Sequence, residues 1–187
     1  VSEQGAAVVA FDISFDRPSS QYPEFERFFQ GFIESERNVC LPIVFAEFDI
    51  IDNEGQSAPI AQAPVLPWEG FRRYAAGLGF TNVDSTHIAS RLPLFAVFGD
   101  STLPAFGLEI ARLYDKATQI DGGSEANSVS LDDFVSDINK SGFYRPDHFG
   151  SLANVRSFSF VDVIQGFRLG EETTDFQNKI VLVGASS

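Results

Sequence analysis

Methionine is absent from this 187-residue chain, cysteine occurs once, and basic residues are half as frequent as acidic ones. A single cysteine, Cys40, cannot close a disulfide within the chain, so cysteine usage does not indicate a redox compartment. No apolar run approaches the ~18 residues of a membrane span, and no signal-peptide pattern opens the chain. We therefore expect the chain as given to be soluble.

The shortage of basic residues gives a formal net charge of −13 and a pI of about 4.4. Such a charge repels phosphate backbones and anionic lipid surfaces, which argues against nucleic acid as a partner. With 187 residues, 44% of them hydrophobic, the chain can bury a sizeable core without a metal or a disulfide. The composition predicts one globular domain spanning residues 1–187.

The start of the chain suggests that it is part of a longer protein. Val1 already lies in the approach to a predicted strand, and a missing start residue is normal for an excised domain. A complete absence of methionine leaves a second possibility open, in which modified residues are missing within the sequence.

The first third of the sequence predicts a strand, a helix and a second strand. The segment GAAVVAFDISF (residues 5–15) is the apolar, β-branched and aromatic run of a strand buried on both faces. Pro23 then opens a helix whose apolar side chains recur at positions 25, 28, 29, 32 and 33. Val39–Phe45 is the next strand. This order is a βαβ unit and predicts an α/β fold with a mixed or mostly parallel sheet covered by helices.

The remaining segments carry weaker signals. Prolines and the turn sequence DNEG predict an irregular surface excursion over residues 49–68. Further expected elements are short strands at Leu78–Val83 and Leu92–Phe98, a helix from Pro104, a short helix from Ser130 to Ile138, a helix from Ser159 that stops at Gly166, and a final buried strand at Lys179–Val183.

The sharpest chemical motif is FGDS (residues 98–101), between a predicted strand and a predicted helix. An α/β hydrolase places its nucleophile at such a turn, and the string is similar to the opening block of the GDSL-type esterases. Asp84 and His87 would then complete a triad with Ser101. However, Thr102 stands where that motif has leucine, and the GxSxG pattern fails at Leu103. A helix N-cap at Ser101 or Thr102 is the favoured interpretation, and a serine esterase is kept as an alternative.

Two carboxylates bracket the end of the first strand, where open α/β sheets place their ligand crevice. Asp12 and Asp16 could bind a cation or a sugar hydroxyl, or they could simply serve the loop and the solvent. His87 and His148 lack the spacing of a zinc site, and Cys40 lies within a strand, where a thiol behaves as a small buried hydrophobe. The residues predict no cofactor, no metal and no catalytic constellation.

Four segments, taken in order, resemble the type-two CHASE domain, a cyclase/histidine-kinase-associated sensory extracellular module. They are GAAVVAFDISF (5–15), GFTNVD leading to RLPL (79–94), LPAFGLE (103–109), and VRSFSFVDVIQG followed by FQNKIVLVGAS (155–186). Together they span almost the whole chain. The family's N-terminal strand and the helix after it are expected to be missing, and residues 85–87 replace its usual Asp-Gly turn.

This resemblance implies a non-enzymatic sensor on the extracytoplasmic face of a bacterial membrane. The implied partners are the protein's own transmembrane helices, a cytoplasmic cyclase, histidine kinase or Ser/Thr kinase, an unidentified small-molecule or environmental signal, and a second copy in a homodimer. A stand-alone periplasmic solute-binding module is a further alternative. The predicted ligand surface is formed by loops at the carboxyl ends of the strands. Its residues are Asp12, Ser14, Asn82, Asp84 and Arg91.

Overall fold

The computed structural model describes residues 5–18, 22–53, 56–82, 92–120, 143–144, 156–169 and 176–184. Their elements form a single α/β domain with a mixed, mostly parallel sheet, as the sequence predicts. The predicted helix at residues 130–138 lies outside the described residues.

The centre of the fold is a parallel sheet in the order β9-β1-β2-β4. Its strands are β1 (Val8–Asp12), β2 (Val39–Asn53), β4 (Gly77–Phe80) and β9 (Ile180–Gly184). The helix α1 (Pro23–Glu36) connects β1 to β2, which confirms the predicted βαβ unit. Val8, Val9 and Ala10 are all buried because β1 lies between two strands and two helical layers.

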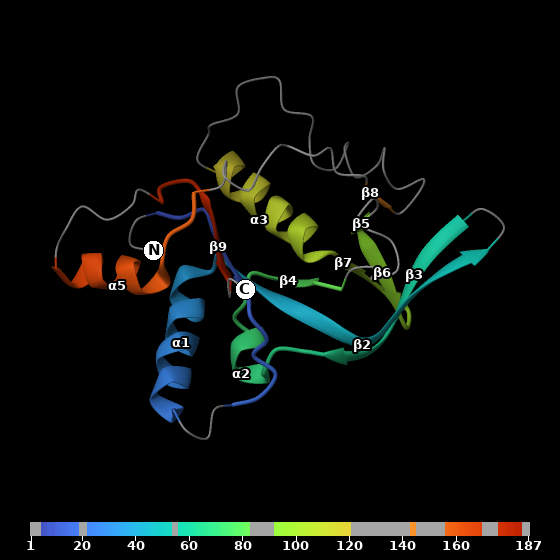
Figure 1. Ribbon diagram of the computed structural model, residues 1–187, viewed down its shortest axis with the longest axis horizontal. Helices are drawn as coiled ribbons and strands as arrows, with labels where there is room; N and C mark the ends of the chain where they lie inside the picture. Colours follow the sequence, from blue (N-terminus) through green and yellow to red (C-terminus); the bar gives the residue numbers. More distant parts are fainter. Residues whose placement is uncertain are drawn as a thin grey trace.

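Helices cover both faces of this sheet (Figure 1). On one face, α3 (Phe106–Ile120) packs Ile110 against Val8, Ala10 and Cys40. On the other face, α1 and the single-turn α2 (Glu69–Arg72) pack on β2, and α5 (Phe160–Leu169) packs on β1 and β9. Alternate residues of a strand point to opposite faces, so the apolar run of β1 supplies both layers.

The segment predicted to be irregular is a long β-hairpin, so that prediction is wrong. β2 continues to Asn53 and pairs antiparallel with β3 (Gln56–Val65) from Val44 onward. The hairpin extends away from the helical layers (Figure 1). Pro59 and Pro64 fit within β3 because a strand with few partners tolerates a missing N–H. Besides β2, β3 pairs only with β6, at Ile60, among the described residues.

The segment around Ser101 also differs from its prediction. β6 (Phe95–Phe98) and β7 (Ser101–Pro104) form a tight hairpin in which Phe98 pairs with Ser101. Gly99 supplies the positive φ of 58° in the two-residue connection. Ser101 therefore lies in a strand-to-strand turn, and α3 begins at Phe106 rather than at Pro104. Neither the nucleophile elbow nor the helix N-cap is present there.

The elements near the end of the chain agree only in part with those predicted from the sequence. Ser159 caps α5, since its Oγ accepts a hydrogen bond from the backbone N–H of Asp162 at 3.4 Å. α5 continues through Gly166 to Leu169, so the predicted stop is wrong. β9 pairs with β1 alone among the described strands, and Ile180 and Leu182 are exposed rather than buried. Residues predicted as one strand at 92–98 divide into β6 and the short β5 (Leu92–Pro93), which pairs with β8 (Phe143–Tyr144).

Candidate functional site

The carboxyl ends of the parallel strands meet at one edge of the sheet. β1 ends at Asp12, β4 ends at Phe80, and β9 ends at Gly184, while β2 passes the same level at Ile43. Loops at this edge of an open α/β sheet are where ligands bind in many proteins of this class. The structure therefore places the end of β1 where the sequence analysis expects a binding surface.

Two predicted site residues, Asp12 and Ser14, are exposed on this edge. The loop that carries them is fixed to the segment before α2, because the backbone N–H of Trp68 donates a hydrogen bond to the carbonyl of Phe15 at 2.6 Å. The Phe15 ring packs against Phe29, with ring centroids 4.9 Å apart. The loop thus presents polar side chains to solvent above an aromatic base.

A third predicted site residue, Asn82, contacts the backbone of its own domain. Its Oδ1 accepts a hydrogen bond from the N–H of Phe45 at 2.7 Å, and its Nδ2 donates one to the carbonyl of Phe45 at 2.9 Å. β2 leaves β4 at this point to form the hairpin, so the Asn82 amide continues the ladder with a side chain. Asn82 and Asp12 lie at the same edge with β2 between their strands, which separates the strands by about 10 Å.

The other residues of the predicted surface are not all placed. Asp84, His87 and Arg91 lie in residues 83–91, outside the described residues, as does His148. Asp16 forms an exposed ion pair with its neighbour Arg17 at 3.3 Å. The structure thus exposes Asp12 and Ser14 on the same loop and leaves the triad of Ser101, Asp84 and His87 without a described geometry.

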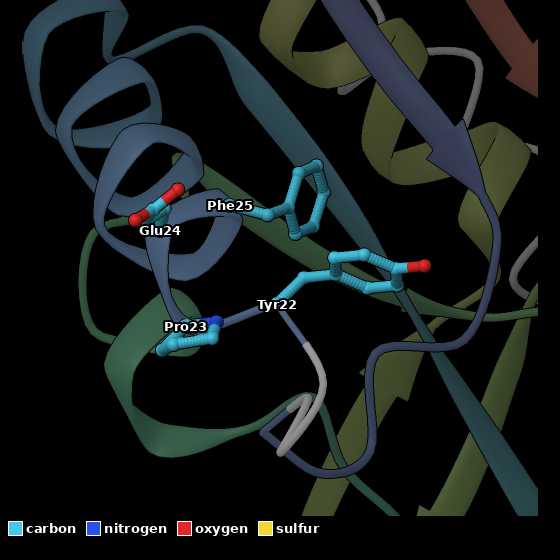
Figure 2. A pocket seen from close by; sticks show the side chains of 4 residues that line it. All are labelled: Tyr22, Pro23, Glu24 and Phe25. Carbon is cyan, nitrogen blue, oxygen red and sulfur yellow. The ribbon is translucent and has the colours of Figure 1, made fainter.

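A depression that the sequence analysis missed lies where the β1 loop enters α1 (Figure 2). It has a volume of about 560 Å³ and is lined by Tyr22, Pro23, Glu24 and Phe25. Figure 2 shows the rings of Tyr22 and Phe25 projecting to the same side, while Glu24 points away from them. The two rings give the depression an apolar lining that suits the apolar part of a ligand, whereas the Glu24 carboxylate points away from the rings. The sequence shows aromatic residues around a helix-starting proline, but their exposure comes only from the structure.

Cys40 is buried in β2, as predicted. Burial, with a smaller contribution from the charge of Glu109, raises the pKa of its thiol to about 12. The thiol is therefore protonated at physiological pH, and its burial disfavours a role as a nucleophile. Within the described part of the chain, no group of three or more His, Cys, Asp or Glu side chains could hold a metal ion.

Comparison with protein families gives a match to the CHASE2 domain over residues 1–187, the whole chain. The chain belongs to the CHASE2 family. CHASE2 domains are extracellular sensory modules of signalling proteins and are not catalytic. The resemblance of the four sequence segments is thereby confirmed.

Neither the curated proteins nor the solved structures contain a significant match to this CHASE2 domain. None of its described helices is both long and apolar enough to cross a membrane.

Proposed function

We propose that this CHASE2 domain is the extracytoplasmic input domain of a bacterial membrane-anchored signalling protein whose output is a cyclase, a histidine kinase or a Ser/Thr kinase. The observation that carries the proposal is the family match along the entire chain. The proposed location outside the cytoplasmic membrane agrees with the extracytoplasmic setting of CHASE2 domains in membrane proteins.

The proposed ligand surface is the carboxyl edge of the sheet. Asp12 and Ser14 are exposed there, and Asp84 and Arg91 follow Asn82 in the sequence. Asn82 supports the edge, since its amide is hydrogen-bonded to the Phe45 backbone. The exposed carboxylate of Asp12 and hydroxyl of Ser14 suit a polar small molecule, to which we propose that Arg91 contributes a guanidinium.

The sheet supplies a direct route from this surface to the last strand. β9 pairs with β1 in parallel from Val8↔Ile180 to Asp12↔Gly184. A ligand that contacts Asp12 therefore acts next to the end of β9, from which we expect the chain to lead to a membrane helix. The signal would shift the balance between two conformations in proportion to the ligand's difference in affinity for them.

The test uses the full-length parent protein in membranes. Asp12→Ala and Arg91→Ala are expected to lower the response of cyclase or kinase output to a change of growth medium, with unchanged membrane level and folding. Asp100→Ala, at the exposed tip of the β6–β7 hairpin, is the matched control and is expected to respond normally. A normal response in both Asp12→Ala and Arg91→Ala would contradict the proposed ligand surface.

A further inference from the structure

Helix α3 lies unusually close to β4 because two glycines face it. Gly77 and Gly79 are alternate residues of β4 and lie on the same face of the sheet. A Cβ atom built on Gly79 would lie 2.5 Å from the Cα of Phe106, the first residue of α3. A Cβ built on Gly77 would lie 2.5 Å from Oε1 of Glu109. The backbone of β4 at Gly77 and Gly79 thus forms a surface without side chains, called here the glycine surface, against which the first turn of α3 packs.

The side chain that fills the space over Gly77 is the carboxylate of Glu109. This side chain is 15% exposed. Its neighbour below is Cys40, the register partner of Gly77 on β2. Its ion-pair partner is Arg112 on the same helix, with Nη1 of Arg112 3.5 Å from Oε2 of Glu109. Arg112 is 54% exposed, so the cation lies at the rim of the contact and not beneath it.

Among the residues that the structure describes, few other ionisable groups face this contact. On β2, the ionisable group that faces Glu109 is Cys40, whose thiol is neutral. The described residues of β4 contain no ionisable side chain. β1 ends at Asp12, which is exposed at the edge of the sheet. From α3 itself come Arg112 and Tyr114, which packs beside Ile110 on the sheet, and Asp115 and Lys116 lie in the next turn. Within the described part of the chain, Arg112 is therefore the cation that compensates the charge of Glu109.

Burial raises the pKa of the Glu109 carboxyl group above its usual value, and the Arg112 guanidinium lowers it by less. The folded state thus favours the neutral form more than the unfolded state does. Stability from this group is fully present below the unfolded-state pKa near 4.5 and is lost as the pH rises through the higher folded-state pKa. The ionised form weakens the packing of α3, and protonation strengthens it.

We propose that Glu109 makes the packing of α3 on the parallel sheet responsive to pH. The neutral carboxyl group holds the helix against the glycine surface of β4, and loss of its proton loosens this contact. The device is a property of the fold and does not depend on the proposed signalling function. In an extracytoplasmic sensor it would make the proton itself one of the signals.

The experiment compares the 187-residue chain with Glu109→Gln and with Glu34→Gln, which changes an exposed glutamate of α1. Urea unfolding is measured from pH 5 to pH 8, together with amide hydrogen exchange corrected for its intrinsic pH dependence. Glu109→Gln is expected to be more stable than the wild type at pH 8, with a difference that shrinks toward pH 5. Exchange in Glu109–Leu113 is expected to speed up with pH in the wild type and in Glu34→Gln, but not in Glu109→Gln.

Parallel pH profiles of the wild type and Glu109→Gln would overturn the proposal, as would a stability difference that grows toward pH 5. If Glu109→Gln does not fold, carbon-detected NMR titration of the wild-type carboxyl groups decides the question. A Glu109 midpoint above that of Glu34 supports the proposal, and a midpoint at or below that of Glu34 overturns it.

Discussion

At the scale of single residues, Asn82 shows how one side chain can replace a strand. Thr81 still donates its backbone N–H to the carbonyl of Ile43 at 3.0 Å, and beyond that point β4 ends. The Asn82 amide then pairs with the N–H and the carbonyl of Phe45. Without it, two backbone groups at the base of the β2–β3 hairpin would lose these partners.

Asn82→Ala is therefore expected to destabilise the domain by about 1–2 kcal/mol, because two part-buried hydrogen bonds are lost. Urea unfolding monitored by circular dichroism measures this loss. Asn82→Asp keeps the acceptor for the N–H of Phe45 but places a negative oxygen against its carbonyl, so it should also destabilise the domain. Full wild-type stability in both variants would show that the two hydrogen bonds contribute nothing.

The thiol of Cys40 gives a second prediction at this scale. Because its pKa is raised to about 12 and the side chain is buried, almost no accessible thiolate exists at pH 8. A thiol-reactive chromophore is expected to label the native protein at least 100-fold more slowly than the urea-unfolded protein, on the order of magnitude set by rare opening of the core. Equal labelling rates in the two states would contradict the burial of Cys40.

At the scale of elements, α1 divides its phenylalanines between the core and the surface. The ring of Phe29 contacts those of Phe11, Phe15 and Phe71 at centroid distances of 5.1, 4.9 and 5.0 Å. Phe28, the preceding residue, is 75% exposed, whereas Phe29 is 5% exposed. The helical period predicts one apolar face, but it does not tell which of two adjacent aromatic residues lies at its centre.

These neighbours form a matched pair for mutation. Phe29→Ala is expected to cost about 3–5 kcal/mol, because it leaves a cavity between α1 and the sheet. Phe28→Ala is expected to change stability by less than about 0.5 kcal/mol, as at most surface positions. Thermal or urea unfolding of the two variants measures the contrast, and losses of similar size would show that α1 packs on another face.

Elements with a local signal could be predicted from the sequence, and those with a distant cause could not. The apolar run at residues 5–15 and the aromatic pattern after Pro23 are sufficient for β1 and α1. The prolines of β3 argued against a strand. The sequence does not show that β3 has few strand partners and therefore tolerates missing N–H groups. Likewise, Gly77 and Glu109 are 32 positions apart, and only the packing of α3 on β4 brings them together.

The candidate site, likewise, could be predicted only where its signal is local in the sequence. Asp12 and Ser14 lie at a strand end that the sequence marks clearly, and the structure places both on the exposed edge. Asn82 has the same kind of position in the sequence, yet its amide is hydrogen-bonded to Phe45, a residue 37 positions away. The FGDS motif was misleading because its last residue, Ser101, begins a strand, β7, that is only four residues long. The depression lined by residues 22–25 could be found only from the folded structure.

At the scale of the whole molecule, the sheet joins the proposed ligand surface to the last strand. The proposed ligand contacts at the end of β1 and the proposed proton binding beneath α3 would both act on the same four parallel strands. Helix α3 packs on β1, β2 and β4, so loosening it changes the support of the strand that pairs with β9. Two kinds of signal could therefore converge on β9, which is the arrangement expected of an input domain.

The most direct test of the central proposal is the sequence of the parent reading frame on both sides of residues 1–187. If the domain is a membrane-anchored input domain, we expect hydrophobic spans of ~20 residues on both flanks, with a cyclase or kinase domain beyond them. A cleavable signal peptide before Val1 and a stop codon soon after Ser187 would contradict it. The protein would then be a free secreted one, and the solute-binding interpretation would replace the membrane sensor.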